Sequence, residues 1–287
     1  MEIFKTGKHL QAHIENLKLK KLKVGFVPTM GALHDGHLSL IKAASKANDV
    51  VMVSIFVNPT QFNKPTDLKN YPRNEDSDIK ILENSACDIV FIPTVDEIYP
   101  NENSMKKKYN FGHIVEIMEG EHRPGHFDGV AMVVSRLFQI TKPNNAYFGQ
   151  KDFQQFILIK TLSDKHLSDL SINVVCCPII REKDGLAMSS RNILLDKNQR
   201  KSAALISKTL FEAKNIYKTY SVKELKENIK TAINADKKLK LEYIEIVSDP
   251  ELNKITQWDD GQKMVACIAV QVGGVRLIDN VYFNSCL

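Results

Sequence analysis

The strongest structural signal in this chain is the segment Pro28-Thr29-Met30-Gly31-Ala32-Leu33-His34-Asp35-Gly36-His37. It follows the apolar run 22–27, which predicts a buried strand, and it precedes the run 38–44, which predicts a helix. A strand, a glycine-containing turn and a helix start form an anion site, because unpaired backbone N–H groups at the helix start point at the ligand. His34 and His37 share a face of the first helical turn and add donors to the same anion. The segment therefore predicts phosphate chemistry.

Two other interpretations of these histidines remain open. A His-x-x-His pair at helical spacing can hold a metal ion, and a histidine is often merely structural. No cluster of carboxylates or cysteines accompanies His34 and His37, which disfavours a metal site. The chain has no P-loop and no Gly-x-Gly-x-x-Gly motif after the first strand, so neither familiar glycine-rich phosphate signature applies.

The bulk composition excludes several classes of protein. The 287 residues are 43% hydrophobic and 25% charged, as in an ordinary globular protein. A net charge of +5 is spread along the chain, whereas a nucleic-acid binder usually clusters its basic residues. The longest basic runs, Lys106–Lys108 and Lys237-Lys238, are short and are expected in solvated loops. No apolar stretch approaches the roughly 18 residues that span a bilayer, and residues 1–6 lack a secretory h-region. We expect a cytoplasmic protein that binds neither nucleic acid nor membrane.

The cysteines support the same compartment. There are five, two of them adjacent, and no Cys-x-x-Cys pair exists. This predicts a reducing environment without a disulfide framework or a zinc ribbon. We expect Cys176 and Cys177 to be a pair of small buried residues.

Strand-like and helix-like segments alternate over residues 1–177, which predicts an α/β domain with a Rossmann-like parallel sheet. Residues 178–287 differ in texture and predict a smaller α+β domain after a short linker near Pro178. The expected strands are 22–27, 50–57, 88–92, 145–148 and 171–176, then 241–247 and 264–272. The expected helices are 38–47, 75–84, 130–140 and 153–166, then 197–217 and 222–235.

Ligands of open α/β sheets bind outside the carboxyl ends of the strands, and polar clusters follow several expected strands. Besides the histidine segment, these clusters are 58–61, 149–155, 186–192 and a glycine-rich loop at 123–129. Each has a structural alternative. Asn58 and Gln61 could be loop caps, Lys151-Asp152 a surface ion pair, Ser189-Ser190 a helix cap and Arg123–His126 a turn.

Taken together, the clusters resemble a known family. The segment Thr29–His37 resembles the HxGH signature of the nucleotidylyltransferase superfamily, and Met188–Arg191 resembles its second, KMSKS-like signature. The complete ordered set resembles the pantothenate synthetase (pantoate–β-alanine ligase) family. Two departures stand out: Gln150 replaces a usual Glu, and the loop 62–67 is less acidic and less glycine-containing. The matching pieces are 28–37, 56–62, 71–73, 123–130, 149–155, 184–192 and 276–280.

The resemblance implies a two-step reaction. The carboxylate of pantoate attacks the α-phosphate of ATP, giving pantoyl adenylate and pyrophosphate. The amine of β-alanine then displaces AMP and gives pantothenate. It further implies Mg²⁺ bound mainly through ATP and water, a homodimer, and a second domain that acts as a lid.

The resemblance also implies roles for individual residues. His34, His37, Lys151 and Arg191 would be catalytic; we favour charge stabilisation for both histidines, with proton donation by His37 secondary. Ile180 matches a backbone contact to adenine. Asp76 and Asp78 are candidate outer-shell magnesium ligands, with no metal held directly by side chains. The implied ATP contacts are Met30, Gly31, His34, His37, Gly149, Lys151, Asp152, Ile180, Met188, Ser189, Ser190 and Arg191. The implied pantoate contacts are Met30, Asn58, Gln61 and Gln155.

Two rival functions remain. Another nucleotidylyltransferase would hand its nucleotide to a phosphate acceptor, and would favour basic residues where Gln61 and Gln155 stand. A nucleotide- or RNA-binding regulator would have kept the fold and lost the chemistry. The intact His34, His37 and Lys151 argue against that loss.

Overall fold

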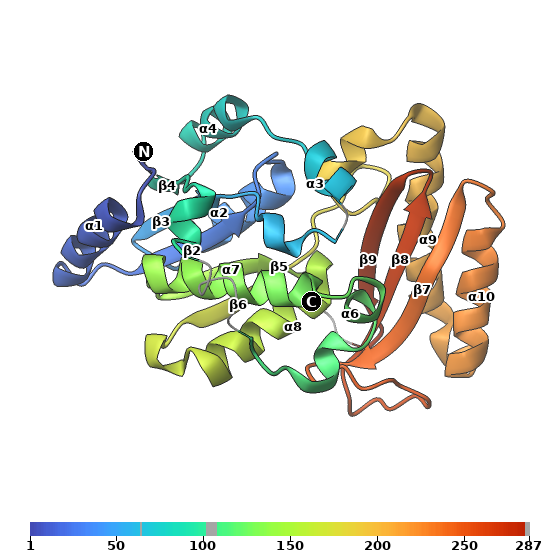
Figure 1. Ribbon diagram of the computed structural model, residues 1–287. Coiled ribbons are helices and arrows are strands. Elements are labelled where there is room, and N and C mark those ends of the chain that lie inside the picture. Colours follow the sequence, from blue (N-terminus) through green and yellow to red (C-terminus); the bar gives the residue numbers. More distant parts are fainter. Residues whose placement is uncertain (64, 102–107, 285–287) are drawn as a thin grey trace. The chain divides into compact units, whose positions relative to one another are not determined.

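The computed structural model describes residues 1–63, 65–101 and 108–284 (Figure 1). Lys106, Lys107 and Cys286 therefore lie outside the described residues, as does Lys64 of the altered loop. The chain divides into two compact units. The first consists of Met1–Gly149 and Gln155–Cys177, and the second of Gln150–Gln154 and Pro178–Leu287. The short segment 150–154 thus belongs with the second unit, although it lies within the first in sequence.

The first unit is built on a six-stranded sheet whose order is β1-β4-β3-β2-β5-β6. Every pair of neighbouring strands is parallel, so the expected Rossmann-like parallel sheet is confirmed. Successive strands add on one side of β2 and then on the other, so the order reverses between β2 and β5. Such a reversal leaves a crevice for ligands outside the carboxyl ends of the strands. The bounds are β1 Glu2–Phe4, β2 Val24–Thr29, β3 Val50–Ile55, β4 Ile89–Phe91, β5 Asn145–Gly149 and β6 Asn173–Cys177.

The helices of this unit cover both faces of the sheet (Figure 1). Helices α4 and α8 begin where expected, whereas α2 begins three residues early, because His34 caps it, and α7 begins four residues early. The bounds are α1 Gly7–Leu19, α2 Asp35–Ser45, α3 Pro65–Asn70, α4 Glu75–Glu83, α5 Val95–Ile98, α6 Glu119–His122, α7 His126–Thr141 and α8 Phe153–Thr161.

Several further features of the first unit differ from expectation. The sequence pattern missed β1 and α1, which lie within the first 19 residues, and the short helices α3, α5 and α6. The expectation that Cys176 is buried is wrong: Cys176 is exposed, whereas Cys177 is buried. The reason is the position of β6, an edge strand that pairs with β5 alone and is covered less completely than the central strands β2 and β3.

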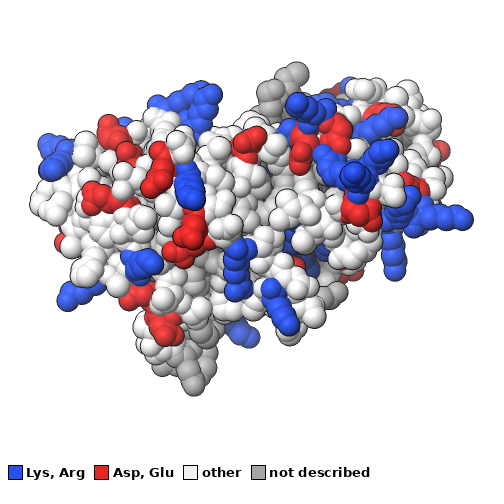
Figure 2. Space-filling model, turned by 90° about the horizontal axis from the view of Figure 1, so that it is seen from above, with Lys and Arg blue, Asp and Glu red and all other residues white. Residues whose placement is uncertain are grey.

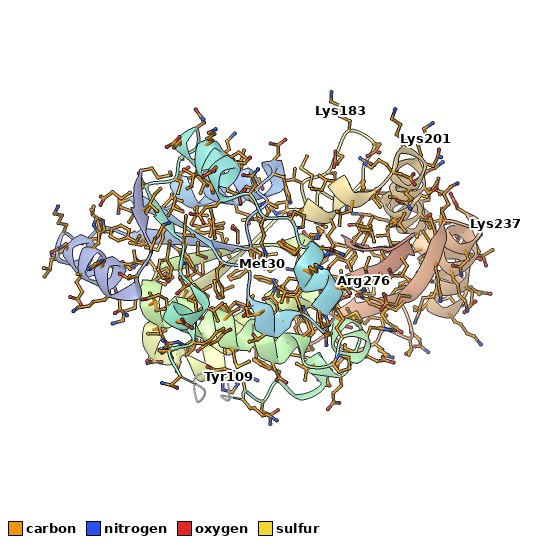
Figure 3. All side chains as sticks on the ribbon, turned by 45° about the horizontal axis from the view of Figure 1, so that its top comes forward. Met30, Tyr109, Lys183, Lys201, Lys237 and Arg276 are labelled. Carbon is orange, nitrogen blue, oxygen red and sulfur yellow. The ribbon has the colours of Figure 1, made fainter. Side chains whose placement is uncertain are left out.

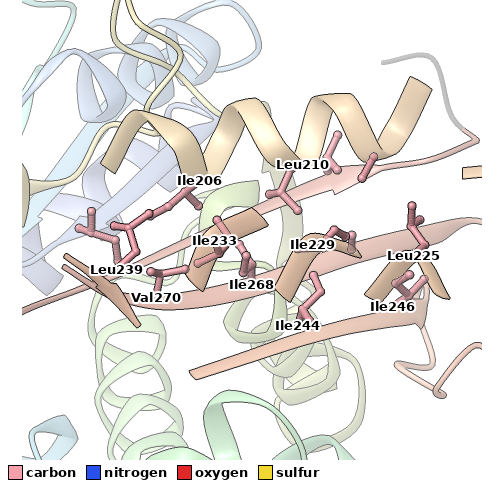
Figure 4. Close-up of a cluster of buried hydrophobic side chains, with 14 of the residues drawn as sticks. Ile206, Leu210, Leu225, Ile229, Ile233, Leu239, Ile244, Ile246, Ile268 and Val270 are labelled. Atoms are coloured by element: carbon pink, nitrogen blue, oxygen red, sulfur yellow. The ribbon is translucent and has the colours of Figure 1, made fainter. Parts of the chain in front are cut away.

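The second unit is an antiparallel three-stranded sheet covered by two long helices, which confirms the expected α+β class. One strand, β9, was not expected. The apolar faces of both helices pack on the sheet through Ile206, Leu210, Ile229 and Ile268 (Figure 4). The bounds are β7 Leu239–Ser248, β8 Met264–Val272, β9 Val275–Tyr282, α9 Lys197–Ile216 and α10 Val222–Asn234.

The surface carries charges of both signs, interspersed over the face shown in Figure 2. Lys237 and Lys238 are exposed, as the sequence predicts, and Lys237 points outward from the second unit (Figure 3). No helix in the described part of the chain has both the length and the apolar character that crossing a membrane requires.

Candidate active site

The turn after β2 is held by a carboxylate from α4. Gly31 has a φ of +76°, and a Cβ there would lie 2.8 Å from an oxygen of Asp78, so only glycine fits. The oxygens of Asp78 accept hydrogen bonds from the backbone N–H groups of Ala32, at 2.9 Å, and of Leu33, at 2.7 Å. Asp78 is buried, and it fixes the backbone immediately before His34.

The side chains of His34 and His37 both accept hydrogen bonds from backbone N–H groups at the start of α2. His34 Nδ1 accepts from the Gly36 N–H at 3.1 Å, and His37 Nδ1 accepts from the His34 N–H at 3.2 Å. The His34 carbonyl accepts from the N–H groups of His37 and Leu38. The expectation of unpaired amides at this helix start is therefore wrong for Gly36, His37 and Leu38, because His34 already binds all three.

These hydrogen bonds determine which nitrogen of each neutral ring carries the proton. Because each Nδ1 accepts a hydrogen bond, the proton of a neutral ring lies on Nε2. The ring centroids are 4.1 Å apart, so the expected shared face is confirmed. An anion at this turn would meet two imidazole N–H donors, rather than the row of backbone amides that the sequence suggested.

The end of β3 contributes two amides beside the same turn. Asn58 caps the short helix Pro59–Gln61 by accepting from the Thr60 N–H, so its capping interpretation is confirmed. The Asn58 side chain also donates to the Oε1 of Gln61, at 3.2 Å. The Nε2 of Gln61 lies 2.8 Å from the Sδ of Met30, which is the residue directly after β2 (labelled in Figure 3). Met30, Asn58 and Gln61 are therefore in contact within the first unit.

In the second unit, Lys151 lies on a short turn that Asn280 of β9 holds. The Nδ2 of Asn280 donates to the carbonyl oxygens of Gln150, at 2.9 Å, and Lys151, at 3.0 Å. Gln150 donates back to the Oδ1 of Asn280 at 2.9 Å, so this amide, in place of the usual Glu, makes a matched pair. Lys151 and Asp152 lie 3.5 Å apart, which confirms their ion pair.

An ion pair between the buried Asp279 and the partly buried Arg181 supports that turn. Arg181 binds Asp279 through two nitrogens, at 2.7 and 2.9 Å, and donates to the Asn280 carbonyl at 3.3 Å. Burial raises the pKa of Asp279, and the paired Arg181 guanidinium opposes that rise. The pair thus connects the segment after Pro178 to the residue that holds Lys151.

The same unit brings Ile180 beside the Met188–Arg191 loop. The Ile180 carbonyl accepts from the Met188 N–H at 2.9 Å, and Arg181 bridges to Ala187 in antiparallel fashion. Ser189 accepts from the Arg191 N–H at 3.3 Å, which confirms its capping interpretation for the helix Ser190–Leu194.

The candidate residues fall into two groups, one in each unit. The first group lies at the ends of β2, β3 and β5 and on α8, and the second lies around the 150–154 turn and the 180–191 segment. The first group is Met30, Gly31, His34, His37, Asn58, Gln61, Gly149 and Gln155. The second group is Lys151, Asp152, Ile180, Met188, Ser189, Ser190 and Arg191.

Among the described residues, no group of three His, Cys, Asp or Glu side chains is arranged to hold a metal ion. Of the two candidate magnesium ligands, Asp76 is exposed on the first turn of α4, and Asp78 binds the Ala32 and Leu33 amides. Mg²⁺ is usually held by one or two carboxylates together with water and substrate phosphates, so of these two residues only the exposed Asp76 has a carboxylate that is not engaged with the backbone of the turn.

Sequence reasoning missed several residues that support the site. The sequence suggests Asp78 only as an outer-shell magnesium ligand, and it suggests no role for Arg181 or Asp279. A buried Asp beside a backbone turn leaves no spacing signal, because its partners lie about 45 residues away. Asn280 lay within a matching motif, yet its contact spans 129 residues of sequence.

Comparison with known proteins places this arrangement in a family. The family model described as pantoate–beta-alanine ligase matches residues 2–282. The pantothenate synthetase of Bacteroides fragilis is 46% identical over 285 residues, covering 99% of this chain and 100% of the relative. That of Cytophaga hutchinsonii is 48% identical over 276 residues, covering 95% of each chain.

Solved structures agree with these relatives. The pantothenate synthetase of Thermus thermophilus superposes with a TM-score of 0.91 at 36% identity, covering 99% of this chain and 100% of that one. The Francisella tularensis pantoate–beta-alanine ligase, solved with beta-gamma ATP and beta-alanine, gives a TM-score of 0.82 at 38% identity, covering 100% and 99%. With matching motifs in both units and relatives aligned over nearly its whole length, this chain belongs to the pantoate–beta-alanine ligase family.

Proposed function

We propose that this chain joins pantoate to β-alanine at the expense of ATP, through a pantoyl-adenylate intermediate. A carboxylate oxygen of pantoate forms a bond to the α-phosphorus, and the bond from that phosphorus to the β-phosphate oxygen breaks. The amine of β-alanine then bonds to the acyl carbon, loses a proton, and AMP leaves. The observation that carries this proposal is the paired imidazole face at the carboxyl end of β2, in a chain that matches the ligase family from residue 2 to 282.

His34 and His37 act on the α-phosphate. Transfer to phosphorus needs little covalent help from a protein; it needs in-line positioning and donors aimed at the developing charge. Two Nε2–H groups on rings 4.1 Å apart meet that need, because their Nδ1 bonds to the backbone fix both ring planes. Charge stabilisation is the main role of both histidines, and proton donation by His37 is secondary.

Gln61 and Gln155 bind pantoate, with Met30 and Asn58 beside them. A neutral amide donates to a carboxylate or hydroxyl without the strong pull of a cation, so the carboxylate stays nucleophilic. The Nδ2 of Asn58 donates a hydrogen bond to the Oε1 of Gln61. The Gln61 amide is thereby oriented with its Nε2 donor toward Met30. A rival phosphate acceptor would instead be recognised by charged donors.

The residues of the second unit bind ATP. Lys151 and Arg191 supply fixed positive charge to phosphate oxygens, Ser189 and Ser190 supply hydroxyl donors, and Asp152 accepts from ribose hydroxyls. Ile180 offers its backbone to adenine. Met188, Gly149 and Gly31 complete the proposed ATP contacts.

Magnesium enters with the nucleotide in this proposal. The exposed Asp76 could reach it only through water, and Asp78 is already engaged with the backbone. When bound, the ion neutralises charge on the phosphates. A homodimer, a cytoplasmic location and closure of the second unit as a lid also belong to the proposal, which includes neither nucleic acid nor membrane as a partner.

A two-stage assay tests the function. ATP and pantoate alone should release pyrophosphate, and AMP should appear only after β-alanine is added. An assay with β-alanine but without pantoate is the matched control and should release neither product. Absence of pantoate-dependent pyrophosphate release would contradict the proposal.

A further inference from the structure

Residues of the glycine-rich loop 123–129 contact the segment that carries Gln61. We propose that His126 is a positioning residue for Gln61 and thereby sets the affinity for the hydroxy acid. This inference rests on the proposed function, in which Gln61 binds pantoate. His126 itself touches neither substrate in this proposal; it acts through the backbone of Gln61.

The hydrogen bonds of His126 fix its tautomer. A nitrogen of Arg123 lies 3.0 Å from the Nε2 of His126, and a guanidinium can only donate. The Nε2 of His126 therefore accepts, and the single proton of the neutral ring lies on Nδ1. That Nδ1–H donates to the carbonyl oxygen of Gln61 at 2.8 Å.

The ring is also held from behind. His126 is only 6% exposed and begins α7, after the turn that its N–H closes onto the Arg123 carbonyl. Arg123 pairs in turn with the buried Glu119, at 3.3 Å. The donor that reaches Gln61 thus comes from a buried ring with little freedom to rotate.

A second contact from the same loop closes on the same segment. A Cβ at Gly129 would lie 2.4 Å from the carbonyl oxygen of Thr60, so α7 can approach this backbone only with glycine there. The Gly129 carbonyl accepts from the Nδ2 of Asn58 at 3.1 Å, and that nitrogen also donates to Gln61. The loop therefore holds the main chain of Gln61 and, through Asn58, its side-chain oxygen.

The consequence concerns the direction of one donor. With its carbonyl and its Oε1 both held, Gln61 presents Nε2 in a single orientation, beside Met30. Without His126, the carbonyl oxygen of Gln61 loses the hydrogen bond from the buried ring. Binding of pantoate should weaken, whereas binding of ATP and β-alanine should change little.

Two isosteric substitutions separate the two bonds of the ring. The amide of His126→Asn reaches the position of Nδ1 and retains a donor for Gln61. The amide of His126→Gln reaches the position of Nε2 and retains only the contact with Arg123. We expect His126→Gln and His126→Ala to raise the KM for pantoate roughly tenfold, and His126→Asn to stay within about threefold of wild type. His122→Ala, on the preceding exposed turn, is the matched control.

A double variant tests whether His126 works through Gln61. In a Gln61→Ala background, His126→Gln should produce little further change in the KM for pantoate, because the positioned side chain is gone. Additive effects would overturn the proposal, as would equal KM values for His126→Asn and His126→Gln. Equal rises in the KM of all three substrates would also overturn it.

The wild-type chain separates this inference from the function on which it rests. Failure of wild type to release pyrophosphate in a pantoate-dependent way would contradict the proposed function itself. Normal wild-type kinetics together with an unchanged pantoate KM in folded His126→Gln would overturn only the positioning role.

Discussion

Replacing His37 with alanine should lower kcat by roughly 10²–10⁴-fold. The ring of His37 lies 4.1 Å from that of His34, and in the proposed function the Nε2–H groups of both rings donate to the α-phosphate. Removing one positioned donor leaves part of the developing charge unstabilised in the transition state. Single-turnover measurement of pyrophosphate release with saturating ATP and pantoate reports this step directly.

His37→Asn separates catalysis from helix capping. Its side-chain oxygen can replace Nδ1 as the acceptor for the His34 N–H, which now lies 3.2 Å away. It has no group at the position of Nε2. We expect His37→Asn to unfold like wild type and yet to lose activity as His37→Ala does. Turnover within about threefold of wild type in either variant would contradict the assigned role.

Replacing Asp279 with alanine should lower the free energy of unfolding by about 3–5 kcal/mol. Asp279 is 3% exposed and accepts two hydrogen bonds from Arg181, so its removal leaves a guanidinium whose side chain is only 18% exposed without its carboxylate partner. Trp258, the only tryptophan, packs on Tyr217 with ring centroids 5.0 Å apart in the second unit. Its fluorescence during urea unfolding therefore reports on the unit that contains the pair.

Two comparisons make the stability measurement specific. Asp260→Ala breaks the exposed pair with Lys218 and should leave the unfolding midpoint nearly unchanged. The double variant Arg181→Met with Asp279→Leu removes both charges and should recover part of the loss. A midpoint for Asp279→Ala equal to that of Asp260→Ala would show that the buried pair contributes little.

The central strand–turn–helix element could be predicted because its signals are local. An apolar run before Pro28 and a helical pattern after His37 suffice to place β2 and α2. The strand Glu2–Phe4 could not be predicted in this way, since three residues carry no recognisable period and its stability comes from pairing with β4. Strand β9 was missed even though Gly273-Gly274 between two apolar runs is typical of a hairpin.

The sequence predicts candidate site residues, but it does not predict the hydrogen bonds that those residues make. The pattern of His34 and His37 singles out the turn that we propose for phosphate, but nothing in it indicates that His34 itself binds the N–H groups of Gly36, His37 and Leu38. A side chain that caps its own helix looks the same in sequence as one aimed at a ligand. Contacts between distant segments, such as Asp78 with Ala32, depend on the tertiary fold and leave no local pattern.

The most direct test of adenylate formation follows the carboxylate oxygens of pantoate. Pantoate labelled in both carboxylate oxygens with the heavy oxygen isotope is incubated with the enzyme, ATP and β-alanine. The masses of the products are then measured by mass spectrometry. Attack on the α-phosphorus should leave one labelled oxygen in AMP and one in pantothenate. Unlabelled AMP, or label recovered in inorganic phosphate, would contradict an adenylate intermediate and with it the proposed function of the paired histidines.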